Sequence, residues 1–172
     1  MSVVKIYPLS PEDWPSVWGM VEPVFRSGET YAFSPDISET EARHVWSDVP
    51  MATYVAIAGD TVVGTYYIKP NQPGLGSHVC NCGYIVGGQS RGRGIATLMC
   101  EHSQREAVRL GFHAMQFNLV VSMNDTAVQL WQRLGFAIVG TLPGAFNHPR
   151  HGFVDALVMY KWLEPYRPEL DQ

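Results

Sequence analysis

The hydrophobic positions of the first fifty residues predict one strand and two helices. Residues 3–7 (VVKIY) are short and rich in β-branched side chains, which is typical of a strand. Ser10 then precedes Pro11 and two acidic residues, the pattern of a helix N-terminus, and this helix should end near Phe25. After a loop, Ser38 caps a second and shorter helix.

The next segments predict three strands in succession. Residues 53–58 and 61–68 alternate on either side of Gly59-Asp60, a two-residue link of the kind that closes β-hairpins. Residues 77–86 follow a stretch rich in proline and glycine, and they lead directly into a glycine-rich loop. We interpret them as a further strand.

A change of period marks a long helix that begins at Gly94. Small or apolar residues recur from there at helical spacing, and Gly111 is a natural stop at the C-terminal end. The predicted buried stripe consists of Ala96, Met99, Cys100, Ser103, Ala107 and Leu110.

The last third of the chain returns to strands around one more helix. Residues 113–121 alternate as a strand, and Asn124 then caps a helix that ends at Gly135. Residues 137–163 predict a final hairpin around the turn-rich segment 146–152 (FNHPRHG). The buried stripe of the helix should be Ala127, Leu130, Trp131 and Leu134.

Length and composition fit a single domain over residues 1–172. The chain is 46% hydrophobic, and 172 residues can bury most of that apolar surface without disulfides or metal. The formal net charge is -4, so nothing indicates the basic face that nucleic acid requires. Because neither an 18-residue apolar run nor a signal-peptide pattern is present, we expect no membrane partner and no export.

The three cysteines, Cys80, Cys82 and Cys100, form an odd and sparse set that favours a reducing compartment, by default the cytoplasm. His78 shares one strand face with Cys80, Cys82 and Tyr84. Successive side chains on such a face lie roughly 7 Å apart, too far for tetrahedral ligands. We therefore expect no metal.

The segment VGGQSRGRGIAT places a glycine-rich loop between a strand and a helix. Such a loop directs unpaired N–H groups and the positive end of the helix dipole toward a phosphate. Gly92 and Gly94 allow close approach or positive φ, while Arg91 and Arg93 can add charge-assisted hydrogen bonds. The Gly-Lys-Ser/Thr of a Walker loop is missing, and Thr97 stands where a Rossmann loop has its third glycine. Pyrophosphate is the natural ligand, and a plain turn with solvated arginines is the alternative.

Two separated motifs resemble those of the GNAT acyltransferases. Gln89, Gly92 and Gly94 match the Gln/Arg-x-x-Gly-x-Gly/Ala motif that this family sets between a strand and a long helix. NDTAVQLWQRLGF resembles the second cofactor segment of the family, with matches at Asn124, Ala127, Leu130, Gly135 and Phe136. The resemblance implies an α+β fold with a mixed, mostly antiparallel sheet of about seven strands, about four flanking helices, and a splay between the fourth and fifth strands.

The same resemblance implies acetyl-CoA as the cosubstrate. The pantetheine arm would lie in the splayed gap, for which we expect a bulge at Gly83. An acceptor amine would attack the thioester directly, through a tetrahedral intermediate. The expected cofactor-binding residues are Ile85, Val86, Gln89, Arg91, Gly92, Arg93, Gly94, Ile95, Ala96, Asn124 and Trp131.

Glu29, His78 and Tyr84 are the candidate catalytic residues. Glu29 lies on a loop that lines the acceptor pocket in similar proteins, and it shares the candidacy for general base with His78. Trp131 replaces the tyrosine that the family usually places near the departing thiol. Either another group protonates the thiolate, or the thiolate leaves without help, and Trp131 itself packs against the cofactor or in the core.

The expected acceptor is a primary or secondary amine of a small molecule, such as an amino acid or its analogue. Tyr31 and Phe33 could form an aromatic wall, Asn118 faces the gap, and His148 and Arg150 lie on the last hairpin, where Arg150 could bind a carboxylate. Core packing and a solvated turn are the alternatives for these residues.

Other functions stay open at this point. The acceptor could be a protein N-terminus or a lysine, and the missing tyrosine would also suit a non-catalytic CoA-binding sensor. Trp14, Trp18 and Trp46 could form an exposed patch for a partner or a homodimer, or they could belong to the core.

Overall fold

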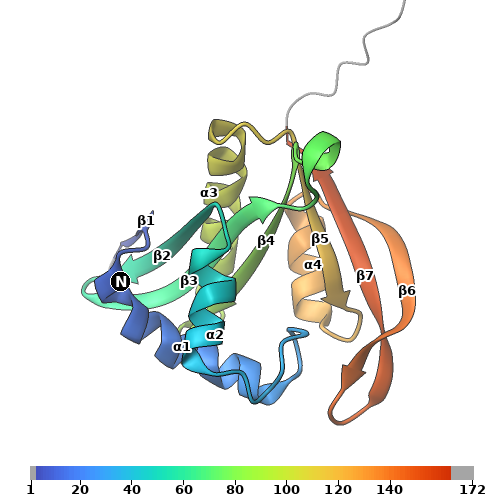
Figure 1. The fold of residues 1–172 in the computed structure, drawn as a ribbon, viewed down its shortest axis with the longest axis horizontal. Helices are drawn as coiled ribbons and strands as arrows, with labels where there is room; N and C mark the ends of the chain where they lie inside the picture. Colours follow the sequence, from blue (N-terminus) through green and yellow to red (C-terminus); the bar gives the residue numbers. More distant parts are fainter. Residues whose placement is uncertain (1–2, 164–172) are drawn as a thin grey trace, which may run out of the picture.

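The computed structural model describes residues 3–163. Its helices and strands alternate along the chain much as the hydrophobic pattern predicts (Figure 1). In order they are β1 (Val4–Pro8), a 3₁₀ turn (Pro11–Asp13), α1 (Trp14–Ser27), α2 (Glu39–Arg43), a π-helical turn (His44–Asp48), β2 (Ala52–Ala58), β3 (Thr61–Pro70), a 3₁₀ turn (Gly74–Gly76), β4 (Val79–Val86), a 3₁₀ turn (Gly88–Ser90), α3 (Ile95–Arg109), β5 (Ala114–Val121), α4 (Asp125–Arg133), β6 (Ala137–His148) and β7 (Gly152–Trp162).

The strands join one mixed sheet of order β1-β2-β3-β4-β5-β7-β6. Neighbouring strands are antiparallel except for β4 and β5, which are parallel. The β4–β5 ladder holds only the pairs Val79↔Ala114 and Cys80↔Met115, although both strands run on beyond them. The predicted splay between the fourth and fifth strands is therefore confirmed.

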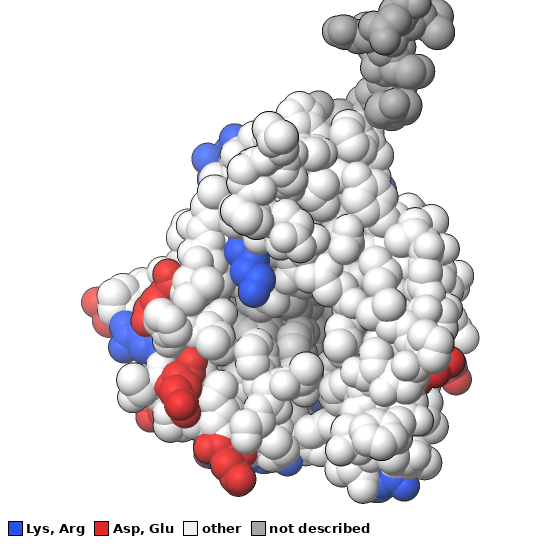
Figure 2. All heavy atoms as spheres, turned by 45° about the vertical axis from the view of Figure 1, so that its right-hand side comes forward, with Lys and Arg blue, Asp and Glu red and all other residues white. Residues whose placement is uncertain are grey.

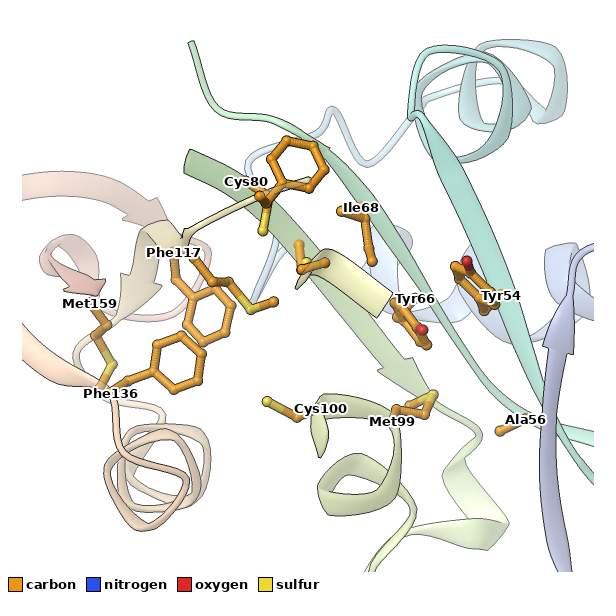
Figure 3. Packing of buried hydrophobic residues seen from close by; sticks show 14 of the residues in the cluster. Tyr54, Ala56, Tyr66, Ile68, Cys80, Met99, Cys100, Phe117, Phe136 and Met159 are labelled. Atoms are coloured by element: carbon orange, nitrogen blue, oxygen red, sulfur yellow. The ribbon is translucent and has the colours of Figure 1, made fainter. Parts of the chain in front are cut away.

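The helices cover both faces of the sheet (Figure 1). On one face, α1 and α2 pack against Val55, Tyr67 and Ile85. On the other face, α3 contributes Met99 and Cys100 to a core with Tyr54, Tyr66 and Ile68. Figure 3 shows this second core, with Phe117, Phe136 and Met159 continuing it past the splay. The alternation of strand side chains thus divides the apolar residues between two cores.

Two predicted helix starts are confirmed by side-chain hydrogen bonds, whereas the segment after Ser10 begins with a 3₁₀ turn and its α-helix starts at Trp14. The Ser38 hydroxyl accepts from the backbone N–H of Glu41 at 3.2 Å, and the side-chain oxygen of Asn124 accepts from the N–H of Ala127 at 3.2 Å. Gly94 is the N-cap of α3 with φ 76°, a left-handed conformation that glycine adopts without strain. These local signals depend on few neighbours, so the sequence reveals them well.

Two predictions about the second half of the chain need correction. The strands of the last hairpin extend through Asn147 and His148, so the turn is shorter than the predicted segment 146–152. No residue of α4 is fully buried, and Trp131 and Leu134 are half-buried, because this helix covers only the arm formed by β5, β7 and β6 (Figure 1).

The predicted bulge at Gly83 is wrong. The β3–β4 register continues without a break through the pair Tyr67↔Gly83. A Cβ atom at this position would lie 2.6 Å from Cε1 of Tyr67 and 3.1 Å from the hydroxyl oxygen of Tyr31. Close approach of aromatic rings, rather than strand irregularity, therefore requires glycine here.

The tryptophans of the first half belong to the interior. Trp14 and Trp46 are buried, and Trp18 packs half-buried against the same α1-side core. An exposed tryptophan patch is therefore not present in this part of the chain. Within residues 3–163, no helix combines the length and apolar character needed to cross a bilayer.

Candidate functional site

The divided sheet leaves an open edge on β4. Past Cys80 the backbone of β4 has no β5 neighbour in the ladder, so its gap-facing N–H and C=O groups are available to other partners. One of them, the carbonyl of Tyr84, accepts a 2.9 Å hydrogen bond from the Tyr31 hydroxyl. Figure 2 turns the right-hand side of Figure 1 forward and shows this face hollowed near its centre, with a basic side chain on the rim.

Asn81 lies at the point where β4 and β5 part, and the sequence analysis missed it. Its side-chain Nδ2 donates to the backbone carbonyl of Gln116 on β5 at 3.0 Å, and its Oδ1 accepts from the Tyr67 hydroxyl at 3.3 Å. The residue is 8% exposed. A buried amide among apolar strand residues was the available signal, since buried polar groups need partners.

The glycine-rich loop presents backbone amides at the start of α3. The N–H of Leu98 makes the first helical bond, to the carbonyl of Gly94 at 3.0 Å, so the amides of residues 95–97 precede that ladder. Gly92 has φ 73°, and no atom lies within 4 Å of a Cβ built at Gly92 or Gly94. Amides outside the helical ladder, next to glycines with open space around them, fit a bound phosphate.

The expected cofactor residues divide into an exposed loop and a buried frame. Gln89, Arg91, Gly92, Arg93 and Gly94 are exposed, Val86 and Ala96 are half-buried, and Ile85 and Ile95 are buried. Buried Ile95 fixes the start of α3 against the core, which positions the amides of the loop. Asn124 contributes its side chain to the cap of α4, so its oxygen is already bonded.

Trp131 lies in an aromatic group beside the open end of the gap. Its ring centroid is 5.1 Å from that of Tyr84 and 5.0 Å from that of Phe117. The Tyr84 hydroxyl lies 2.7 Å from Oγ of Ser103, which in turn donates to the carbonyl of Cys100. Burial raises the pKa of Tyr84 well above its usual value, so its phenol stays protonated at neutral pH.

Glu29 and Arg150 are brought together across the open end of the gap. Nη2 of Arg150 lies 2.6 Å from Oε1 of Glu29, with the two side chains 70% and 37% exposed. Glu29 follows α1, while Arg150 is in the β6–β7 turn, so the pair joins the two arms of the divided sheet. Both residues were expected at the site, but the ion pair between them was not.

A hollow of about 590 Å³ extends from Glu29 along α1 to the glycine-rich loop, where Gly88, Gln89 and Arg91 line it. Thr30 also lines it, and the hydroxyl oxygen of Thr30 is buried without a hydrogen-bond partner among the described residues. A larger hollow of about 710 Å³ lies along α2 between Ser34 and Asp48 and contains none of the predicted site residues.

His78 is separated from Glu29. It precedes β4 at the closed end of the gap, where its carbonyl accepts from the N–H of His113 and its ring lies 6.3 Å from Trp162. Cys80, Cys82 and Tyr84 lie together on the face of β4 that is covered by α3, as predicted. His78, which was expected on the same face, precedes the strand. No group of three metal-ligating side chains converges within residues 3–163.

The residues expected to contact the acceptor mostly have protein partners. Tyr31 and Phe33 stack at 6.0 Å, and Tyr31 lies 5.5 Å from Trp46, so these rings form one aromatic group against the α1-side core. Asn118, which was expected to face the gap, bonds the side chains of Asn71 and Gln116. His148 is buried at the end of β6, and its Nδ1 accepts from the N–H of Arg150 at 3.2 Å.

Comparison with known proteins agrees with this geometry. The family model for the acetyltransferase (GNAT) family matches residues 5–136. A GCN5-related N-acetyltransferase structure from Kribbella flavida is 39% identical, with a TM-score of 0.87 over 92% of this chain and 97% of that one. YncA from Salmonella typhimurium, solved with its cofactor acetyl-CoA, is 17% identical with a TM-score of 0.81, covering 97% of this chain and 98% of that one.

A curated relative, the N-acetyltransferase aca1 of Schizosaccharomyces pombe, is 38% identical over 57% of this chain. The match spans only 47% of the length of that protein. The match to the family model extends over most of the chain, and the divided sheet and the loop before α3 accord with it. This chain belongs to the GNAT acetyltransferase family.

Proposed function

We propose that this protein is an acetyl-CoA-dependent N-acetyltransferase that acts on a primary or secondary amine of a small molecule, such as an amino acid or its analogue. One observation carries the proposal: the amides that precede the α3 hydrogen-bond ladder adjoin the free edge of β4, which starts directly after the pair Cys80↔Met115. A pyrophosphate on the amides and an extended arm along the edge would together match CoA.

The residues present fit that molecule. Gly92 and Gly94 leave open space on the loop, and Arg91 and Arg93 stand exposed beside them to add charge-assisted hydrogen bonds. Free N–H and C=O groups on the β4 edge can pair with the amides of pantetheine as another strand would. The site therefore selects by backbone geometry and local charge, in a chain of net charge -4.

When bound, acetyl-CoA supplies an acetyl group activated as a thioester. A free N–H on β4 can hydrogen-bond the oxygen of that acetyl group as negative charge develops on it. The sulfur can depart as a thiolate and take its proton from water, because a thiol is far more acidic than an alcohol. Tyr84, whose ring lies 5.1 Å from that of Trp131, is a poor proton donor to it, because burial raises the pKa of the phenol and its hydroxyl already bonds Ser103.

Glu29 is the proposed base that removes a proton from the acceptor amine. Its carboxylate lies beside Arg150 at the open end of the gap, and Glu29 lines the hollow that reaches the glycine-rich loop. When an amino acid binds, the ion pair between Glu29 and Arg150 can be replaced by two others. The carboxylate of Glu29 would then bind the ammonium group, and the guanidinium of Arg150 would bind the carboxylate of the amino acid. This pairing favours an amino acid over a simple amine.

The test is release of free CoA thiol over a panel of small amines, with wild-type protein and the Glu29→Gln variant. We expect Glu29→Gln to lower kcat/KM at neutral pH by about 100-fold or more, the usual contribution of a general base, with the Kd of acetyl-CoA changed by less than about twofold. Equal rates for the two proteins would remove Glu29 from the mechanism.

Arg150→Gln is the matched control, because it breaks the same ion pair and leaves the carboxylate in place. If the pair only holds the two arms together, both variants should lose the same activity. If Glu29 is the base, Arg150→Gln should keep kcat while raising KM for acceptors that carry a carboxylate.

The replacement of the usual tyrosine by Trp131 supports a second candidate, a CoA-binding sensor without turnover. Binding of acetyl-CoA by the wild type, with no thiol release above hydrolysis for any amine, would favour the sensor. We also propose a cytoplasmic location, supported by the three cysteines, which are all free thiols.

A further inference from the structure

A hydrogen bond from a side chain connects β4 and β5 at the point where the sheet divides. The β4–β5 ladder ends at Cys80 and Met115, and the next residue on each strand is Asn81 and Gln116. Between these two, a side-chain amide takes the place of a backbone donor, because Nδ2 of Asn81 binds the carbonyl of Gln116 at 3.0 Å. Because the asparagine side chain extends across the space between the strands, the strands can move apart here while the carbonyl of Gln116 keeps a hydrogen bond.

The orientation of the Asn81 amide is fixed from the other side. Its Oδ1 accepts from the hydroxyl of Tyr67, and the Tyr67 ring lies 4.9 Å from the buried ring of Trp46 in an edge-to-face contact. With its oxygen held by β3, the amide can direct only its nitrogen toward β5. Because Asn81 is 8% exposed, water competes little for either bond.

A second set of amides ties β5 to the loop before β4. The side chain of Gln116 donates to Asn118, and Asn118 donates to Asn71 at 2.7 Å. The N–H of Asn71 in turn binds the carbonyl of Val79. These bonds hold β5 near the closed end of the gap, but none of them joins β5 to the strand residues that form the open edge.

We propose that Asn81 is a positioning residue that sets where β4 and β5 part, and through that the place of the pantetheine arm in the gap. This inference rests on the proposed function, since it assumes that CoA occupies the gap. Without the amide bridge, the half-buried carbonyl of Gln116 loses this donor, and either water or a shift of the parted strands must replace it. The nucleotide end of CoA, on the loop before α3, does not depend on this bridge.

The test compares two ligands by calorimetry: CoA and 3′-phosphoadenosine 5′-diphosphate, which is the same nucleotide without pantetheine. The first variant is Asn81→Leu, which keeps the size of the side chain but cannot form hydrogen bonds. The second is Asn81→Ser, a smaller polar change, which serves as the test if the leucine variant does not fold. We expect the Kd of CoA to rise about tenfold, equal to about 1.4 kcal/mol, and the Kd of the nucleotide to stay within about twofold.

Asn71→Leu is the matched control, because it makes the same chemical change in the same group of amides without touching the bridge. It should leave the ratio of the two Kd values unchanged. The proposal is overturned if the Asn81 variants bind CoA like the wild type, if they weaken both ligands equally, or if they change only KM for the acceptor. Failure of wild-type protein to bind CoA would instead refute the proposed function itself.

Discussion

Gly83→Ala is the sharpest test of how the gap-lining strand is packed. The substitution adds one methyl group at the centre of β4, in a strand whose register is regular. That methyl carbon would lie 2.6 Å from Cε1 and 3.0 Å from Cζ of the Tyr67 ring, closer than carbon atoms approach in ordinary contact. Either the ring or the strand must move.

The size of the effect follows from how firmly Tyr67 is held. The ring is 6% exposed, it packs edge-to-face on the buried Trp46, and its hydroxyl donates to Asn81. Overpacking a well-filled core costs about 1–3 kcal/mol, and this confined ring places the cost in the upper half, about 2–3 kcal/mol. For a chain of 172 residues, each kcal/mol lowers Tm by about 2–4 °C, so we expect a loss of about 4–12 °C.

Thermal unfolding followed by circular dichroism measures this loss. Gly140→Ala is the control: it is also a strand glycine, yet no atom lies within 4 Å of its added Cβ, so Tm should stay or rise slightly. In a Tyr67→Leu background, adding Gly83→Ala should cost less than it does in the wild type, because only the hydroxyl oxygen of Tyr31, 3.1 Å from the added methyl carbon, still obstructs it. Equal Tm values for the two alanine variants in the wild-type background would refute the packing explanation.

Two further predictions concern the loop and the sheet. Gly94→Asp should abolish CoA binding in calorimetry, because it puts a negative charge beside the bound pyrophosphate, whereas Gly74→Asp, which has the same charge and a similar positive φ (56° against 76°) on another loop, should bind normally; equal binding by the two variants would refute the phosphate site. Burial lowers the pKa of His102, whose Nδ1 lies 2.6 Å from the Tyr66 hydroxyl, below its usual 6.5, so the folded protein takes up this proton less readily than the unfolded chain. The stability that this neutral histidine contributes is therefore complete above about pH 6.5 and is lost as pH falls toward the lower folded-state pKa. Urea unfolding between pH 7.5 and about pH 5 should show a steeper loss of stability for wild type than for His102→Gln, and parallel curves would contradict the assignment.

Helix starts and the division of the sheet could be predicted from the sequence. The caps at Ser38, Gly94 and Asn124 are local patterns of a few residues, and each forms as predicted. The glycine-rich loop likewise follows directly from residues that are neighbours in the chain. The place of the splay came from a family resemblance that covers nearly the whole chain, and the short ladder at Cys80 and Met115 agrees with it.

Contacts between distant segments could not be predicted. The prediction of a bulge at Gly83 is wrong because a single sequence does not show that Tyr67 and Tyr31, from other elements, both lie against that residue. Asn81 passed unnoticed because its partner, Gln116, lies 35 residues away. Glu29 and Arg150 were each expected near the acceptor, but only the fold brings the loop after α1 to the β6–β7 turn.

These long-range contacts together explain how a sheet that divides can still hold a site rigidly. One arm carries the glycine-rich loop and Glu29, and the other carries Trp131 and Arg150. Asn81 bridges the arms at the closed end, and the Glu29–Arg150 pair bridges them at the open end. At the level of the closed end, Lys161 of β7, which pairs with Met115, donates to the side chain of Gln104 on α3 at 2.5 Å.

A gap bridged at both ends has a fixed length, unlike an open hinge. Because the bridge at Asn81 is buried and the pair of Glu29 and Arg150 is exposed, the closed end is the firmer of the two. A ligand can therefore displace the exposed ion pair without parting the strands further. If the proposed function holds, we therefore expect the acceptor to exchange at the open end, where residues of both arms meet, and the cofactor to be aligned from the closed end.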